Sequence, residues 1–277
     1  MKFQLKALAA AAILAASIPA HAALDNGATG SSSLILTLLD TSNNISAAFD
    51  LGKNYANFNI NTVGSGNVDS NVDAPGTTFS WNLAADGLNN GVQGDYATAW
   101  STFFQTANIN NVKFAIFAND NTTTGAGNRG IITTYAGNGT ALGSSALVTL
   151  MGQADAYTHA IGAINGNVIQ NHSSVLYGGS VSIAGQGYAG AYYGLNKNNG
   201  VGPFATAAIG SSLGVAQLVT GVGTGTAPQT VFAGATFSLS NTRALVYSVA
   251  AVPEADTWAM MMLGLGFMGF VARRKQA

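Results

Sequence analysis

The chain has 277 residues, of which only 8% are charged, and it contains no cysteine. Residues 23–251 hold five lysines and arginines against nine aspartates, which leaves a net charge of −4. This balance argues against a basic nucleic-acid-binding patch, and without cysteine the chain forms neither disulfides nor thiolate metal sites.

The N-terminal residues have the three-part pattern of a secretory signal peptide. Two lysines supply positive charge, residues 7–18 form an apolar stretch, and Ala20 and Ala22 provide the small residues of a cleavage pattern. We therefore predict a signal peptide over residues 1–22, cleaved after Ala22. The alternative, an N-terminal membrane anchor, is less favoured because the apolar run is short for a bilayer.

We predict that residues 23–251 form a single domain, mainly β with some α, that is β-sandwich-like and has two inserted helices. Strands are expected where apolar residues run together or alternate between turns rich in Gly, Asn, Ser and Thr. The expected strands are residues 33–39, 45–51, 77–83, 112–118, 131–135, 230–240 and 244–249. The first two and the last two are expected to pair as hairpins, because short polar loops join them.

The strand expected at residues 112–118 has apolar side chains on both faces. Its even-numbered residues, including Phe114 and Ile116, share one face, and Phe117 lies on the other. A strand buried on both faces belongs in the middle of a sheet. We therefore expect this strand to be central.

Two stretches have the spacing of amphipathic helices. After Asp95, a candidate N-cap, apolar residues recur every three or four positions, and the same spacing follows Ser144 and Ser145, either of which can begin a second helix. We interpret both apolar stripes as core packing. Residues 178–225 are rich in glycine and weakly patterned, so no element is predicted there. The stripes comprise Tyr96, Trp100, Phe103, Phe104 and Ala107, then Leu147, Leu150, Met151, Ala154, Thr158 and Ile161.

The C-terminal residues 252–277 combine a short motif, an apolar segment and a basic end. Residues 258–272 carry no charge. As a helix they would span about 22 Å, whereas a bilayer core is about 30 Å thick. We therefore predict a hydrophobic helix that is short for a permanent span, with its basic end cytoplasmic. The motif and the basic end are Pro253, Glu254, Arg273, Arg274 and Lys275.

This tail resembles the PEP-CTERM sorting signal of Gram-negative bacteria, also called the ice-binding protein C-terminal domain. Ala255 stands where that family most often has proline. The resemblance implies that exosortase, a membrane protease and transpeptidase, reads Pro253 and Glu254 and removes the tail. The alternative is a plain tail anchor with a coincidental Pro-Glu pair. Residues 33–124 also resemble, faintly, the N-terminal half of many uncharacterised PEP-CTERM proteins, a group that implies no activity.

One loop has the spacing of a cation site. Asp69, Asn71 and Asp73 alternate, so their oxygens can face one hard cation such as calcium, although the glycine and glutamate of an EF-hand loop are missing. The alternative is a solvated loop of Asx turns. Residues 119–121 form a second, weaker oxygen cluster. No other cofactor is expected.

The exported region carries no glutamate, and its only histidines are His159 and His172. Acid–base catalysis would therefore have to use aspartates or these two histidines, and no catalytic arrangement of them is visible. We predict a non-enzymatic surface or extracellular-matrix protein associated with exopolysaccharide or biofilm. The alternative is a carbohydrate-binding β-sandwich module or a glycan-active enzyme. Exposure of Trp81, or of the tyrosines at 192 and 193, would favour sugar binding, and burial would favour a structural role.

The expected partners follow from the two terminal signals. They are the export machinery, exosortase, the inner membrane during processing, and exopolysaccharide at the destination, with no nucleic acid. The expected location is the cell surface or extracellular matrix, reached by export across the inner membrane and tail processing.

Overall fold

The computed structural model describes residues 24–28, 30–60, 70–122, 128–136, 142–164, 173–177, 188–191, 205–222, 225–251, 261–263 and 265. The strands are β1 (Ser33–Asp40), β2 (Ile45–Asn54), β3 (Thr78–Asn82), β4 (Gly87–Asn89), β5 (Val92–Gly94), β6 (Lys113–Asp120), β7 (Gly130–Tyr135), β8 (Ser173–Tyr177), β9 (Ala207–Ala208), β10 (Ser212–Val219), β11 (Gln229–Leu239) and β12 (Ala244–Val249). The helices are α2 (Tyr55–Phe58), α3 (Tyr96–Phe104), α4 (Ser144–Ile164) and the 3-10 turn η1 (Ala189–Ala191).

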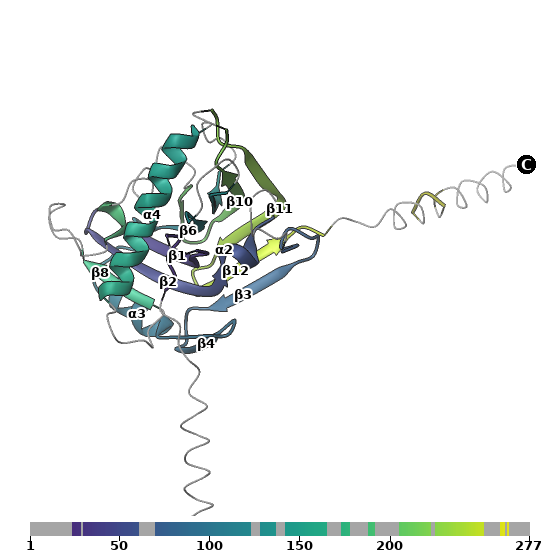
Figure 1. The fold of residues 1–277 in the computed structure, drawn as a ribbon. Coiled ribbons are helices and arrows are strands. Elements are labelled where there is room, and N and C mark those ends of the chain that lie inside the picture. Colours follow the sequence, from purple (N-terminus) through teal and green to yellow (C-terminus); the bar gives the residue numbers. More distant parts are fainter. Residues whose placement is uncertain are drawn as a thin grey trace, which may run out of the picture.

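Ten strands form one antiparallel sheet, and β4 and β5 form a separate hairpin. The order in the sheet is β3-β12-β11-β10-β7-β6-β1-β2-β8, with β9 paired to β6 (Figure 1). The predicted mainly β class is confirmed, as are both predicted hairpins, which are β1 with β2 and β11 with β12. The sheet is nearly closed, so one continuous sheet supplies the facing walls of the sandwich-like core.

The central strands are buried on both faces because each face contacts a separate apolar cluster. Phe114 and Ile116 of β6 belong to the larger cluster, whereas Phe117 belongs to the smaller one, as the alternation predicts. In the larger cluster, Trp100 and Phe103 of α3 pack with the sheet. On the opposite face, α4 packs against β6 and β10 through the smaller cluster (Figure 1).

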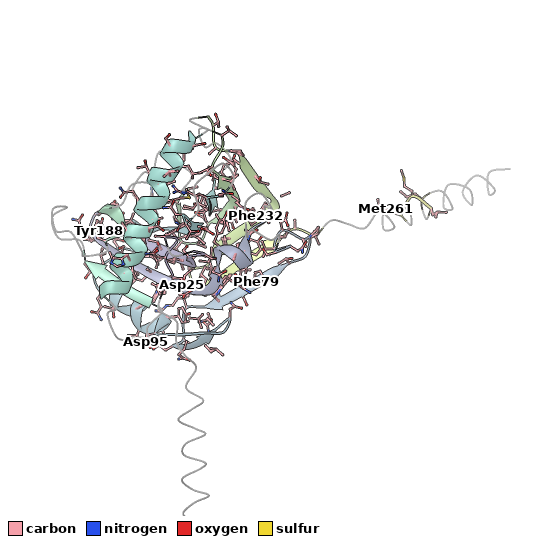
Figure 2. All side chains as sticks on the ribbon, in the orientation of Figure 1. Asp25, Phe79, Asp95, Tyr188, Phe232 and Met261 are labelled. Atoms are coloured by element: carbon pink, nitrogen blue, oxygen red, sulfur yellow. The ribbon has the colours of Figure 1, made fainter. Side chains whose placement is uncertain are left out.

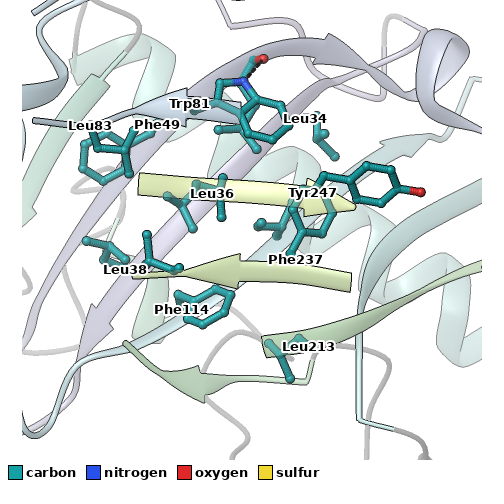
Figure 3. Packing of buried hydrophobic residues seen from close by; sticks show 14 of the residues in the cluster. Leu34, Leu36, Leu38, Phe49, Trp81, Leu83, Phe114, Leu213, Phe237 and Tyr247 are labelled. Atoms are coloured by element: carbon teal, nitrogen blue, oxygen red, sulfur yellow. Dashed lines mark hydrogen bonds between the residues drawn. The ribbon is translucent and has the colours of Figure 1, made fainter. Parts of the chain in front are cut away.

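The two ends of the sheet approach each other through Trp81. This residue lies on the edge strand β3 and is 1% exposed. Its indole Nε1 donates to the carbonyl of Leu51 on β2 at 2.7 Å (Figure 3). Nearby, Lys53 Nζ lies 4.5 Å from the ring centre of Phe79. These contacts join β3 to β2 across the open side of the sheet.

The start of α3 corrects one sequence prediction. Asp95 occupies the N-cap position, but its side chain accepts no capping hydrogen bond, so the predicted side-chain cap is wrong. Its backbone has φ −91° and ψ 54°, outside the extended conformation from which a capping side chain reaches the first turn. Asp86, in the loop before β4, binds the first turn instead. Its carboxylate accepts hydrogen bonds from the backbone N–H of Thr98 at 3.0 Å and from the Thr98 hydroxyl at 2.7 Å.

The β4–β5 hairpin covers the free edge of β3. Asn89 is nearly buried, and its side chain both accepts the backbone N–H of Asn82 at 2.9 Å and donates to its carbonyl at 3.1 Å. Beside it, Asn90 Nδ2 donates to the carbonyl of Ser80 at 3.1 Å. The exposed backbone of an edge strand can pair with another chain. Here the amide side chains of Asn89 and Asn90 bind the backbone groups of β3, so those groups are not free to pair.

We expect Asn89→Ala to reduce stability and promote self-association. The variant leaves the Asn82 N–H and carbonyl without partners, at a cost of about 1–3 kcal/mol, and opens the β3 edge. Chemical denaturation and light scattering measure the two effects. Leu88→Ala is the control, because Leu88 lies on the same hairpin and is 67% exposed. Equal stability and equal self-association in both variants would contradict a protective role for Asn89.

Candidate functional site

The residues of the predicted sorting tail lie mostly outside the described part of the chain. Pro253, Glu254, Arg273, Arg274 and Lys275 all fall there, as do the cleavage residues Ala20 and Ala22. The described tail residues, 261–263 and 265, are helical, and Met261 is exposed (Figure 2). Within the described residues, no helix combines the length and apolar character needed to cross a bilayer.

The predicted cation loop is described only in part, because Asp69 lies outside the described residues. Asn71 has φ +53°, a left-handed conformation that asparagine tolerates, and its carbonyl accepts the N–H of Ala74 at 3.1 Å. Val72 anchors the turn, since its carbonyl accepts from the Tyr247 hydroxyl at 2.9 Å. Asp73 follows in this turn, and calcium binding by the loop stays a prediction.

A second polar cluster is built between α4 and the end of β6. Asn119 Nδ2 donates to Asp155 Oδ1 at 2.8 Å, and Asn121 Nδ2 donates to Asp155 Oδ2 at 2.8 Å. Asn119 is fully buried and Asp155 is 7% exposed. The carbonyl oxygens of both amides, Oδ1 of Asn119 and Oδ1 of Asn121, are buried and have no hydrogen-bond partner. We call Asn119, Asn121 and Asp155 the Asp155 cluster.

The N-terminal segment forms one wall of the Asp155 cluster. The carbonyl of Gly27 accepts the backbone N–H of Asn121 at 2.8 Å. A Cβ atom at position 27 would lie 2.2 Å from Asn119 Nδ2 and 2.7 Å from Asp155 Oδ1, so only glycine allows this close approach. Ser32 adds further contacts, since its N–H donates to the carbonyl of Asn119 at 2.8 Å and its hydroxyl accepts the Asn119 N–H at 2.7 Å.

The sequence indicated residues 119–121 as an oxygen cluster but not their partner. Asp155 follows Met151 by four residues on α4, so it lies on the apolar face that packs on the sheet. A charged residue on that face was the signal in the sequence for a polar partner across the interface. By contrast, Asp120 turns away, and its carboxylate accepts from Thr122.

Residues 210–214 read Gly-Ser-Ser-Leu-Gly, the spacing of the nucleophile elbow of α/β-hydrolases. Such an elbow needs a strand followed by a sharp turn into a helix. Here Ser212 instead begins strand β10, and Gly210 in the preceding turn has φ +91°. The motif is therefore a turn entering a strand. His159 lies exposed on α4, and His172 falls outside the described residues.

Of the aromatic residues that were candidates for sugar binding, the structure describes Trp81, and its side chain is buried in the core. Trp81 packs 6.2 Å from both Phe79 and Phe237, measured between ring centres. The tyrosines at 192 and 193 lie outside the described residues. Within the described part of residues 23–251, the large exposed hydrophobic side chains are aliphatic: Leu88, Ile109, Val222 and Val231.

Comparison with known proteins identifies the tail. A family model, the PEP-CTERM protein-sorting motif, matches residues 251–275. Searches of curated proteins and of solved structures gave no match. The matched residues cover the Pro-Glu pair, the apolar segment and the basic end, as the resemblance implied. The chain therefore carries a PEP-CTERM sorting motif, which marks it as an exported protein sorted by exosortase.

Proposed function

We propose that residues 23–251 act after export as a non-enzymatic component of the cell surface or the extracellular matrix. The observation that carries this proposal is the burial of Trp81, which is 1% exposed and bonded internally to Leu51. A sugar-binding face needs aromatic rings that remain available for stacking. The described surface offers aliphatic side chains and neutral polar residues instead, which suits packing against other matrix components.

Fractionation of the native host tests this proposal. The processed protein is expected in the matrix fraction or the outer-surface fraction, rather than in the inner membrane. A pull-down with purified exopolysaccharide then distinguishes specific sugar binding from structural packing against matrix components. Retention that free oligosaccharide competes away would establish a lectin-like module and overturn the structural role. Retention without such competition, or assembly with other surface proteins, supports it.

We expect Pro253→Ala combined with Glu254→Ala to block tail processing. The two residues are the motif that the sorting enzyme would read, so the variant should keep residues 252–277 and accumulate in the inner-membrane fraction. Immunoblotting for the size difference and membrane fractionation measure this outcome. Ala255→Pro is the matched control, since it introduces the residue that the family most often carries and should be processed normally. Unchanged processing of the double variant would refute the sorting role of the Pro-Glu pair.

A further inference from the structure

The first half of strand β11 has an unpaired side. One side of the strand pairs with β10, whereas on the other side β12 pairs only with residues 235–239. The last hydrogen bond on that second side runs from the N–H of Ala250 to the carbonyl of Gly234 at 3.0 Å. Among the described residues, no strand pairs with the second side of residues 229–233 and no side chain bonds to its backbone. We call this side the open edge.

The register of β11 on β10 shows which backbone groups lie at the open edge. In an antiparallel pair, alternate residues direct their N–H and C=O groups toward the partner strand and away from it. The N–H of Val219 donates to the carbonyl of Pro228 at 3.0 Å, so these two residues form a hydrogen-bonded pair. Two residues further along, Thr230 and Gln217 occupy the next such pair. Val231 follows Thr230, so its N–H and C=O point away from β10 and toward the open edge.

The open edge lacks the protection that the β3 edge has. At β3, the side chains of Asn89 and Asn90 bind the edge backbone. Residues 229–233 carry no charge and no proline, which are the usual devices against strand pairing. Val231 is 46% exposed, while the neighbouring Phe232 is buried in the larger cluster and anchors the strand. The open edge is therefore a fixed, uncharged strand whose backbone is available for the addition of another strand.

We propose that a second copy of this chain pairs with the open edge, antiparallel and about a two-fold axis at Val231. A two-fold interface requires a surface that is complementary to itself. Val231 meets this requirement, because the N–H of each copy would face the carbonyl of the other in a hydrogen-bonded pair. The absence of charge removes repulsion between identical strands and gives an unrelated partner little to recognise.

The pairing joins the sheets of two copies into one continuous sheet and places the two Val231 side chains opposite each other. Such cross-strand pairs of β-branched residues stabilise sheets. The inference goes beyond the proposed surface or matrix role and does not depend on it, because a sugar-binding domain can pair in the same way. If the chain is a matrix component, the open edge gives it a means of assembly.

Sedimentation of the full-length chain in detergent, over a range of protein concentrations, tests the pairing. The wild-type chain is expected to dimerise reversibly. Val231→Pro should weaken the dimer about tenfold or more, because it removes one edge N–H from each copy and leaves the pairing of Thr230 with β10 in place. Val231→Thr is the matched control, since it keeps the edge N–H and a β-branched side chain and should dimerise like the wild type. A wild-type chain that stays monomeric, or a proline variant that dimerises equally well, would overturn the proposal.

Cysteine cross-linking gives a second readout, which decides the matter if Val231→Pro fails to fold. The chain has no cysteine, so an introduced thiol is the only one present. A hydrogen-bonded antiparallel pair brings the two Cα atoms to about 5.5 Å, within reach of a short bifunctional thiol reagent. Val231→Cys should therefore give cross-linked dimers. Ile109→Cys is the control, because Ile109 is 48% exposed and lies away from the open edge. Equal cross-linking of the two variants, or none in Val231→Cys, would refute the two-fold pairing.

Discussion

Replacing Trp81 with alanine is expected to lower the free energy of unfolding by about 3–5 kcal/mol. The substitution removes a fully buried indole that packs on Phe79 and Phe237. It also leaves the Leu51 carbonyl without the indole N–H. Because Trp81 connects the edge strand β3 to β2, the variant loses packing and also a bond that holds the two ends of the sheet together.

Trp81→Phe separates these two contributions. The phenylalanine ring retains most of the packing but donates no hydrogen bond, so a smaller loss of about 1–2 kcal/mol is expected. Denaturant unfolding followed by far-ultraviolet circular dichroism measures both variants. A ligand-stacking tryptophan would behave differently, since its replacement leaves stability nearly intact and removes binding. A wild-type midpoint for Trp81→Ala would therefore argue against both the packing role and the structural function built on it.

The parts of the fold that the sequence predicts are those in which side-chain pattern and burial agree. In β6, the alternation of Phe114 and Ile116 against Phe117 matches the separation into two clusters on opposite faces. Short polar loops join the strands of the β1–β2 and β11–β12 hairpins, so the sequence pattern alone predicts their pairing.

Strand β10 was not predicted, although it lies inside the sheet between β7 and β11. Its residues Ser212–Val219 include Gly214 and the buried polar Gln217, which weaken the apolar pattern. Gln217 is buried because its partners are distant in sequence: its Nε2 donates to the Tyr55 hydroxyl at 2.7 Å, and its Oε1 accepts the N–H of Ile60 at 2.9 Å. A local pattern cannot reveal such long-range compensation.

The same limit applies to the Asp155 cluster. Asn119 lies in β6 and Asn121 directly follows its last residue, so the spacing of two suggests that the two side chains are on the same side of the chain. The sequence of α4 indicates equally that Asp155 lies on the helix's apolar side. What it leaves open is which strand that side meets and at what height, because the crossing of α4 over the sheet depends on tertiary packing.

Asp40 is a buried carboxylate that holds the β1–β2 turn to the segment after α3. It accepts the backbone N–H groups of Asn108 at 2.8 Å, Ser42 at 2.9 Å and Asn43 at 3.3 Å, and the Asn43 amide at 2.8 Å. Burial alone would raise the pKa of this carboxyl, but these donors stabilise the charged form and together bring its pKa below the ordinary 3.8. The ionised form of Asp40 is therefore the one that stabilises the fold.

Asp40→Asn is expected to cost about 2–4 kcal/mol at pH 7, because the neutral amide presents N–H groups to a site built from donors. A carboxyl whose pKa is lower in the folded state contributes stability above its unfolded pKa and loses it as the pH falls through its folded pKa. The difference between wild type and variant should therefore be constant above about pH 5 and narrow below about pH 4. Urea titrations across this range measure the difference.

Asp95→Asn is the matched control for the cost at pH 7. It makes the same chemical change at a carboxylate that accepts no capping hydrogen bond, so it should lower stability much less than Asp40→Asn does. An Asp40→Asn deficit that persists undiminished at low pH would mean that shape, rather than charge, is what the turn requires. A stability difference that becomes smaller as the pH falls would instead identify the ionised carboxylate of Asp40 as the group that holds this turn to the segment after α3.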